Sequence, residues 1–305
     1  MWLVLAFCGP ILWAASTHID KYLVDRYFGN SDTTVLMVFT AMVGVIMLLP
    51  IGYWVPGVFA QTPADVGVLC ASGILYMAAM LFYLRALQTE EASVVAPLLQ
   101  TTTLFTFVFG YAFLGETLTR SGMVGGVLIV AGALLISADL STHRRKFKPR
   151  LMLLMVGCAA VLALSTVIFK FFAVRDRFWV TTFWTYAGEG LFGLGIASVP
   201  RYRRQFAGLF QRSPGTMLFV NGVNELINLG GALAVRFAAL LAPVALVSAV
   251  SSTSTVFVFL FGILLTLFSP RLGRERLARR DLLQKGAAAC LMAAGVAVWQ
   301  VSAPL

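Results

Sequence analysis

Two glutamates, Glu189 and Glu225, lie deep inside long apolar stretches of the sequence. Glu189 is 12 residues from Arg177 and from Arg201, and Glu225 is 11 residues from Arg236. At 1.5 Å per helical residue, each carboxyl group lies roughly 16 to 18 Å from its flanking boundaries, near the middle of a hydrocarbon layer about 30 Å thick. A charge at that depth costs about 2.5 to 3.5 kcal/mol, so residues of this kind are usually functional.

A carboxyl group without water around it is most stable when it carries no charge, and a second carboxylate nearby strengthens that preference. Either a proton or a bound cation can neutralise it. We therefore expect Glu189, Glu225 or both to exchange a proton against a substrate. The alternative is that a protonated glutamate only joins two helices by a hydrogen bond.

Further polar residues accompany these acids. Asn221, Asn224 and Asn228 join Glu225 at helical spacing on one face, which indicates a cavity wall rather than a surface facing lipid. Other candidates for the substrate path are Gln100, Ser251, the aromatic residues Tyr76 and Trp184, and Lys170, which could contact an anion, pair with Glu189 or simply extend to the membrane surface. Pro97 and Pro243 each open an apolar stretch and are predicted hinges.

The elements that position these residues are membrane helices. Of the 305 residues, 59% are apolar and 12% are charged, whereas soluble domains have about 25% charged residues. We predict ten spans, at 2–19, 33–54, 66–88, 92–114, 121–138, 151–173, 178–199, 215–235, 242–268 and 282–301. Helices are expected because barrel strands are about half as long. Little chain remains for a soluble catalytic domain, and we expect no enzyme activity.

The basic residues predict orientation rather than nucleic-acid binding. The net charge is +10, but 18 of the 23 lysines and arginines lie in the connections after odd-numbered spans. Basic connections stay in the cytoplasm, so we expect a multi-pass protein of the bacterial inner (plasma) membrane with both termini on the non-cytoplasmic side. The four cysteines lie inside spans without metal-ligand spacing, and we expect no metal and no cofactor.

Internal matches indicate a repeat. Residues 86–98 and 232–244 share the pattern A-L-x-x-x-x-A-x-x-x-A-P, and residues 16–21 and 165–170 share S-T-x-I-x-K. Five spans in each half is an odd number, so the second half must enter the membrane from the opposite side. Inverted repeats of this kind occur in many secondary transporters, with the substrate site near the midplane where the repeats meet.

These paired segments, together with FLGETLTRSGMVGGVLIVAGALLIS at 113–137, resemble the EamA-type members of the drug/metabolite transporter superfamily. The resemblance covers the whole chain as two repeats, 1–138 and 151–301, joined by a basic cytoplasmic linker at 139–150. It implies an all-α transporter of ten transmembrane helices. Its central cavity would be built from helices one to four and six to nine, with helices five and ten at the periphery.

The predicted function is therefore secondary active transport of a small metabolite or drug-like solute, with H⁺ as the coupling ion and membrane lipid as the surroundings. Two buried acids and no arginine or lysine in the middle of a span favour a cationic, zwitterionic or neutral polar substrate. The alternatives are an uncoupled facilitator or channel, and a non-transporting scaffold or lipid-handling partner protein. Small residues at Gly122, Gly125, Gly126 and Gly132 predict close helix packing and leave a homodimer contact open.

Overall fold

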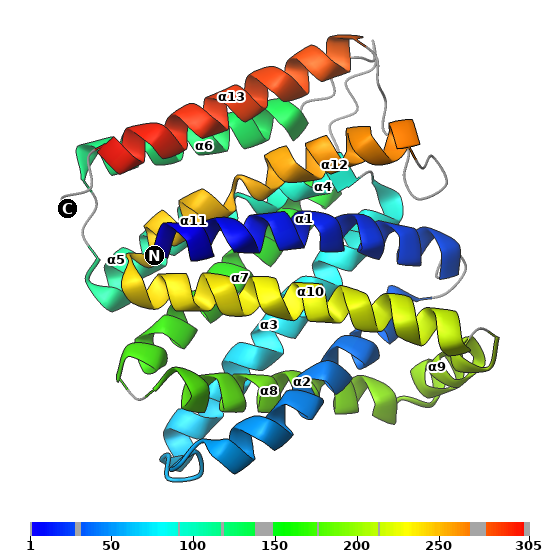
Figure 1. The fold of residues 1–305 in the computed structure, drawn as a ribbon. Helices are drawn as coiled ribbons and strands as arrows, with labels where there is room; N and C mark the ends of the chain where they lie inside the picture. The colour runs from blue at the N-terminus through cyan, green and yellow to red at the C-terminus, as the bar shows by residue number, and fades with distance from the viewer. Residues whose placement is uncertain are drawn as a thin grey trace.

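The computed structural model describes residues 2–27, 32–90, 92–116, 119–137, 149–175, 177–212, 214–268 and 279–301. These residues form α-helices joined by short turns, with no strand among them (Figure 1). The helices are α1 (Trp2–Tyr27), η1 (Thr33–Val35, a 3₁₀ turn), α2 (Leu36–Trp54), α3 (Pro63–Thr89), α4 (Ala92–Leu99), α5 (Thr102–Leu114), α6 (Arg120–Ser137), α7 (Pro149–Arg175), α8 (Phe178–Ser198), α9 (Pro200–Arg212), α10 (Pro214–Leu241), α11 (Val244–Ser251), α12 (Ser254–Phe268) and α13 (Arg279–Val301).

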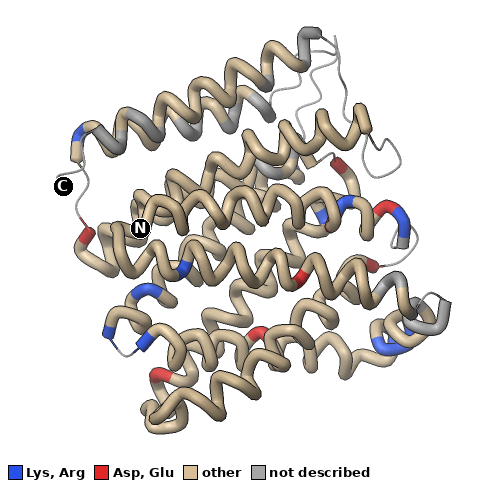
Figure 2. Tube along the Cα trace, in the orientation of Figure 1, with Lys and Arg blue, Asp and Glu red and all other residues tan. Residues whose placement is uncertain are grey.

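The chain is a multi-pass integral membrane protein. Six segments of its described part are long and apolar enough to cross a membrane, namely Trp2–Arg26, Thr33–Trp54, Pro63–Thr89, Arg150–Arg175, Leu218–Leu241 and Val244–Phe268. Figure 2 shows that most lysines and arginines lie toward the two ends of the helices, as expected for groups that must stay near water. The start of α1 and the end of α13 lie at the same end of the bundle (Figure 1).

Two of the predicted spans are not continuous helices. The stretch 92–114 is divided between α4 and α5 at Gln100 and Thr101, and 242–268 is divided between α11 and α12 at Ser252 and Thr253. The side chains of Thr101, Ser252 and Thr253 each donate a hydrogen bond to the backbone carbonyl three residues earlier. Such bonds compete with the regular helix, which tightens here into 3₁₀ turns.

The two prolines occupy different places in these interrupted helices. Pro243 directly precedes α11, in an extended conformation that starts the helix. Pro97 lies inside α4, with five helical residues before it, and not at its start. The two matched segments therefore end at different places in the helices: 86–98 ends inside α4, whereas 232–244 ends at the first residue of α11.

Three helices differ in extent from the prediction. α1 continues to Tyr27 instead of ending near residue 19, and α10 continues to Leu241 instead of ending near residue 235. α9 (Pro200–Arg212) occupies a stretch that we expected to be a plain connection. These longer helices place Asp20 and Arg236 inside the bundle, whereas the sequence suggested that both lie at span ends.

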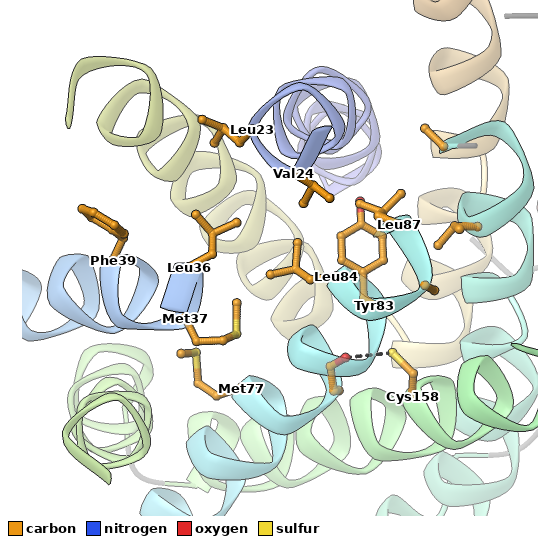
Figure 3. Close-up of a cluster of buried hydrophobic side chains, with 14 of the residues drawn as sticks. Leu23, Val24, Leu36, Met37, Phe39, Met77, Tyr83, Leu84, Leu87 and Cys158 are labelled. Carbon is orange, nitrogen blue, oxygen red and sulfur yellow. Dashed lines mark hydrogen bonds between the residues drawn. The ribbon is translucent and has the colours of Figure 1, made fainter. Parts of the chain in front are cut away.

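The bundle is assembled from helix pairs. α1 packs along α10, α2 along α8, α3 along both α7 and α8, and α6 along α13 at one edge of the molecule (Figure 1). The largest core cluster lies where α1, α2, α3 and α7 meet, and Figure 3 shows Leu23, Leu36, Met77 and Leu84 within it. At its edge the thiol of Cys158 donates a hydrogen bond to the carbonyl of Ala79, 3.1 Å away.

α3 and α8 approach each other closely because each helix contributes a glycine that lies against the backbone of the other. A Cβ atom on Gly188 would overlap the backbone carbonyl of Cys70, and one on Gly73 would overlap the carbonyl of Thr185. Small residues of this kind let two membrane helices touch backbone to backbone. α2 and α10, by contrast, make only a few contacts with each other.

Candidate functional site

A pocket lies between α2, α3, α8 and α10, near the middle of these helices. Its empty space, including the opening to solvent, is about 360 Å³. Its lining combines ionisable, aromatic and small apolar side chains: Thr40, Val43, Gly44, Tyr76, Tyr186, Glu189, Glu225, Asn228, Leu229, Ala232 and Arg236. Both glutamates singled out from the sequence therefore line one pocket, together with Tyr76 and Asn228.

Arg236 is the counter-charge of Glu189. The distance from Arg236 Nη2 to Glu189 Oε1 is 3.7 Å, and the two side chains are 14% and 5% exposed. The guanidinium also lies over the rings of Phe169 and Tyr186, at 4.7 Å and 5.3 Å from their centroids. Such contacts stabilise a cation that has lost water. Arg236, which we expected at a span end, lies inside α10, because the helix continues five residues beyond it.

Three polar atoms at this wall of the pocket are buried and have no hydrogen-bond partner within the described part of the chain. They are Glu189 Oε1, Arg236 Nη1 and Tyr186 Oη. An unpaired buried polar group costs about 1–3 kcal/mol, so a complementary polar group that enters the pocket would relieve this cost. Together they offer an acceptor, a charged donor and a hydroxyl within one wall.

Glu225 is held by a hydrogen bond from α2. It is 6% exposed and accepts a hydrogen bond of 2.5 Å from the hydroxyl of Thr40 on α2. Asn228, one turn further along α10, also lines the pocket. Glu225 and Glu189 thus face one space from α10 and α8, each with a different polar neighbour.

The polar face of α10 does not all point into the pocket. Asn221 and Asn224 are buried but are not among the lining residues. The amide of Asn224 instead donates a hydrogen bond of 2.7 Å to Asp20 on α1. Asp20, which we expected at a span end, is therefore a further acid inside the bundle.

Several other predicted residues lie away from the pocket and hold helices together. Gln100 donates to the hydroxyl of Ser254 over 2.8 Å and so connects the breaks of the two interrupted helices. Ser251 bonds to the carbonyl of Val247 in its own helix, and Trp184 donates to the carbonyl of Val58 in the turn after α2. None of Gln100, Ser251 and Trp184 lines the pocket.

Lys170 pairs with Glu116 and not with Glu189. Its ammonium lies 2.6 Å from Glu116 Oε1 and 2.8 Å from the carbonyl of Ala242. Both oxygens of Glu116 also accept the backbone N–H of Val244, the first residue of α11. A carboxylate at a helix start is favourable because that end carries partial positive charge. The cluster therefore anchors α11, outside the pocket.

The sequence contains a signal for the true position of Arg236, which we had placed at a span end. Five apolar or small residues follow Arg236 before the helix-ending Ala242-Pro243 pair, so the proline marks the end of α10 better than the charge does. Thr40 had no such signal, since a single threonine hydroxyl within a span usually bonds to its own backbone. Among the described residues, no group of three or more His, Cys, Asp or Glu could hold a metal ion.

Comparisons with known proteins agree with this architecture. The EamA-like transporter family matches residues 1–138. A protein of Sinorhizobium sp described as "Uncharacterized transporter in cobO 3'region" is 33% identical over 143 residues, which is 45% of this chain and 94% of that protein. A solved structure titled "Crystal structure of protein" shares the fold, with a TM-score of 0.67, 17% identity and coverage of 99% of each chain. The chain belongs to the EamA-like transporter family.

Proposed function

We propose that this transporter is proton-coupled and moves a small polar solute by alternating access of two inverted five-helix repeats, 1–138 and 151–301. The observation that carries the proposal is one pocket in the middle of the bundle that is lined by Glu189, Glu225 and Arg236. Charged groups at that depth are costly and are kept where an ion or a substrate passes.

The contacts between helices support the repeat. In the proposed correspondence α1 matches α7, α3 matches α10, and the interrupted pair α4–α5 matches α11–α12. α1 packs along α10 just as α7 packs along α3, and α1 also packs on α12 just as α7 packs on α5. Reciprocal contacts of this kind are expected when two halves are related by a pseudo-twofold axis. The linker proposed at 139–150 lies almost entirely outside the described residues.

A difference between two equivalent contacts supports alternating access. Under the same correspondence, the α3–α8 contact matches the α10–α2 contact. The first is tight and packs Gly188 against backbone, whereas the second is sparse and borders the pocket. Exchange of these two packings between the halves would close the pocket on one side and open it on the other.

The lining suggests how a proton and a substrate are exchanged. Arg236 and the hydroxyl of Tyr186 can bind an acceptor group such as a carboxylate, while Glu225 and Glu189 can bind a cationic or hydrogen-bond-donating group. A cationic group and a proton compete for the same carboxylate, so loading one releases the other. Arg236 now favours a zwitterionic or neutral polar solute over a purely cationic one, because a lone cation would face its charge.

A thermal-shift screen of metabolites at two pH values tests the proposal, because a ligand that binds the folded state raises its apparent stability. We expect zwitterionic hits whose stabilisation depends on pH and disappears in Glu225→Gln. The matched control is Asp25→Asn, which removes an exposed acid near the end of α1. In liposomes the hit should accumulate against its gradient when a pH difference is imposed. Accumulation that is absent, or unaffected by a protonophore, would make the protein an uncoupled facilitator.

A further inference from the structure

The connection between α8 and α10 contains a helix whose chemistry the transport pocket does not use. α9 (Pro200–Arg212) follows α8 after Val199 and lies at the end of the bundle opposite the start of α1 (Figure 1). The connection at the same place in the first half, residues 55–62, contains no helix. α9 is therefore an addition to one half of the chain.

α9 has one apolar and one basic face. Tyr202 and Phe206 are four residues apart, so they share a face, and both pack half-buried against the main core cluster. The ring of Phe206 lies 4.7 Å from that of Phe39 on α2. Arg204 falls on the opposite face, with Arg201 and Arg203 on either side of it, and all three arginines are exposed.

These arginines are weakly balanced by acids. The sequence of α9, PRYRRQFAGLFQR, has no acidic residue. One described acid, Asp32, interacts with Arg201. Burial alone would raise the pKa of its carboxyl, but hydrogen bonds from Thr34 and the charges of Arg85 and Arg201 lower it below its usual value. Within the described residues, no acid forms an ion pair with Arg203 or Arg204. The outer face of α9 therefore carries net positive charge.

We propose that α9 binds anionic phospholipids, with Arg201, Arg203 and Arg204 contacting the headgroup phosphates of the leaflet on its side. A cluster of basic residues directly beside the end of a membrane-spanning helix is typical of segments that bind anionic headgroups. The end of a membrane-spanning bundle, where α9 lies, is at the depth of the headgroups. Arginine suits this role because its planar guanidinium can donate hydrogen bonds to two phosphate oxygens at once, in addition to its charge.

The position of α9 gives such binding a structural effect. α9 leads directly from α8, which carries Glu189, to α10, which carries Glu225 and Arg236. Headgroups bound to α9 hold the adjoining ends of both pocket helices at the membrane surface. This inference does not depend on proton coupling or on the identity of the transported solute.

Native mass spectrometry of the purified full chain in neutral detergent tests the proposal by titration with phosphatidylglycerol and with phosphatidylcholine. Near an anionic membrane surface each arginine contributes about 1 kcal/mol, which is about 5-fold in affinity. With three arginines, we expect the first phosphatidylglycerol to bind on the order of 100-fold more tightly than phosphatidylcholine. The variant R201Q/R203Q/R204Q should lose this preference.

The matched control is R26Q/R120Q/R177Q, which removes three exposed arginines elsewhere in the chain and should keep the preference. The thermal transition of each variant in neutral detergent shows whether it is folded. If the triple variant does not fold, R203Q/R204Q can replace it, because it leaves the interaction between Arg201 and Asp32 intact. This double variant should still weaken phosphatidylglycerol binding by about 25-fold. The proposal is overturned if the native chain has no preference, if the variant at α9 keeps it, or if the control loses it equally.

Discussion

The contact between α3 and α8 can be tested with one added methyl group. Gly188→Ala places a Cβ atom on the backbone carbonyl of Cys70, which cannot rotate away as a side chain can. Gly195→Ala, seven residues further along α8, is the matched control because no atom lies within 4 Å of its added Cβ. On α3 the equivalent test is Gly73→Ala, whose Cβ atom would overlap the Thr185 carbonyl. Its control is Gly67→Ala, whose Cβ atom would lie in open space.

The size of the effect follows from two terms. Replacing glycine by alanine within a helix stabilises it by roughly 0.5–1 kcal/mol, and this term is common to both members of each pair. Overpacking costs about 1–3 kcal/mol, and at Gly188 the rigid neighbour places the cost toward the upper end. We therefore expect Gly188→Ala to be about 2–3 kcal/mol less stable than Gly195→Ala.

Unfolding in mild detergent measures this difference, and the reactivity of one cysteine shows where it arises. Cys70 lies at the contact and is partly buried, and its thiol donates to the carbonyl of Trp184. Separation of the two helices should make Cys70 react faster with a maleimide, whereas the buried Cys158 should not change. Equal stability and equal Cys70 reactivity in the two variants would refute the close contact.

Three further predictions concern single acids. Asp20→Ala should destabilise the protein by about 1–3 kcal/mol in unfolding measurements, because it leaves the buried amide of Asn224 without its partner. Glu116→Gln should cost about 3 kcal/mol, because it removes the counter-charge of the largely buried Lys170. Asp32 has a pKa below its usual value, so its contribution to stability is full above about pH 4 and is lost as the pH falls through the lowered pKa. Asp32→Asn should therefore flatten the acid limb of a plot of thermal transition against pH.

Each of these variants has a control elsewhere in the chain. Asp25→Ala removes an exposed acid five residues after Asp20 and should change stability by less than about 0.5 kcal/mol. Asp65→Asn removes the partner of the half-exposed Arg175 and should cost at most about 1 kcal/mol. Equal effects of Glu116→Gln and Asp65→Asn would contradict the buried character of the Lys170 pair, and an unchanged acid limb in Asp32→Asn would exclude its stabilising role.

The position of Glu189 and Glu225 near the middle of their helices could be predicted from the sequence, because helix length is proportional to residue number. Each lies more than ten residues from the nearest lysine or arginine on either side within its span, so an error of a few residues at a helix end does not move it out of the middle. The prediction of several membrane helices is confirmed. Membership in the EamA-like family, predicted from the motifs, is also confirmed.

Arg236 and Asp20 could not be placed in the same way, because each lies where the apolar pattern ends but the helix does not. Packing of α10 against α1 extends both helices beyond their apolar stretches, and a charged residue there is accommodated by one specific partner. For Arg236 that partner is Glu189, and for Asp20 it is Asn224. Such pairs depend on which helices are neighbours, and spacing along the chain carries no information about that.

The breaks in the two interrupted helices also have an electrostatic consequence. At the crossing, α4 packs against α12 and α11 packs against α5, and Gln100 bonds to Ser254 between them. The carbonyl-rich tail of each short helix, with its partial negative charge, is thereby set beside the amide-rich head of a helix from the other half, with its partial positive charge. The four peptide dipoles compensate one another at this point, so the seam between the two halves needs no counter-ion.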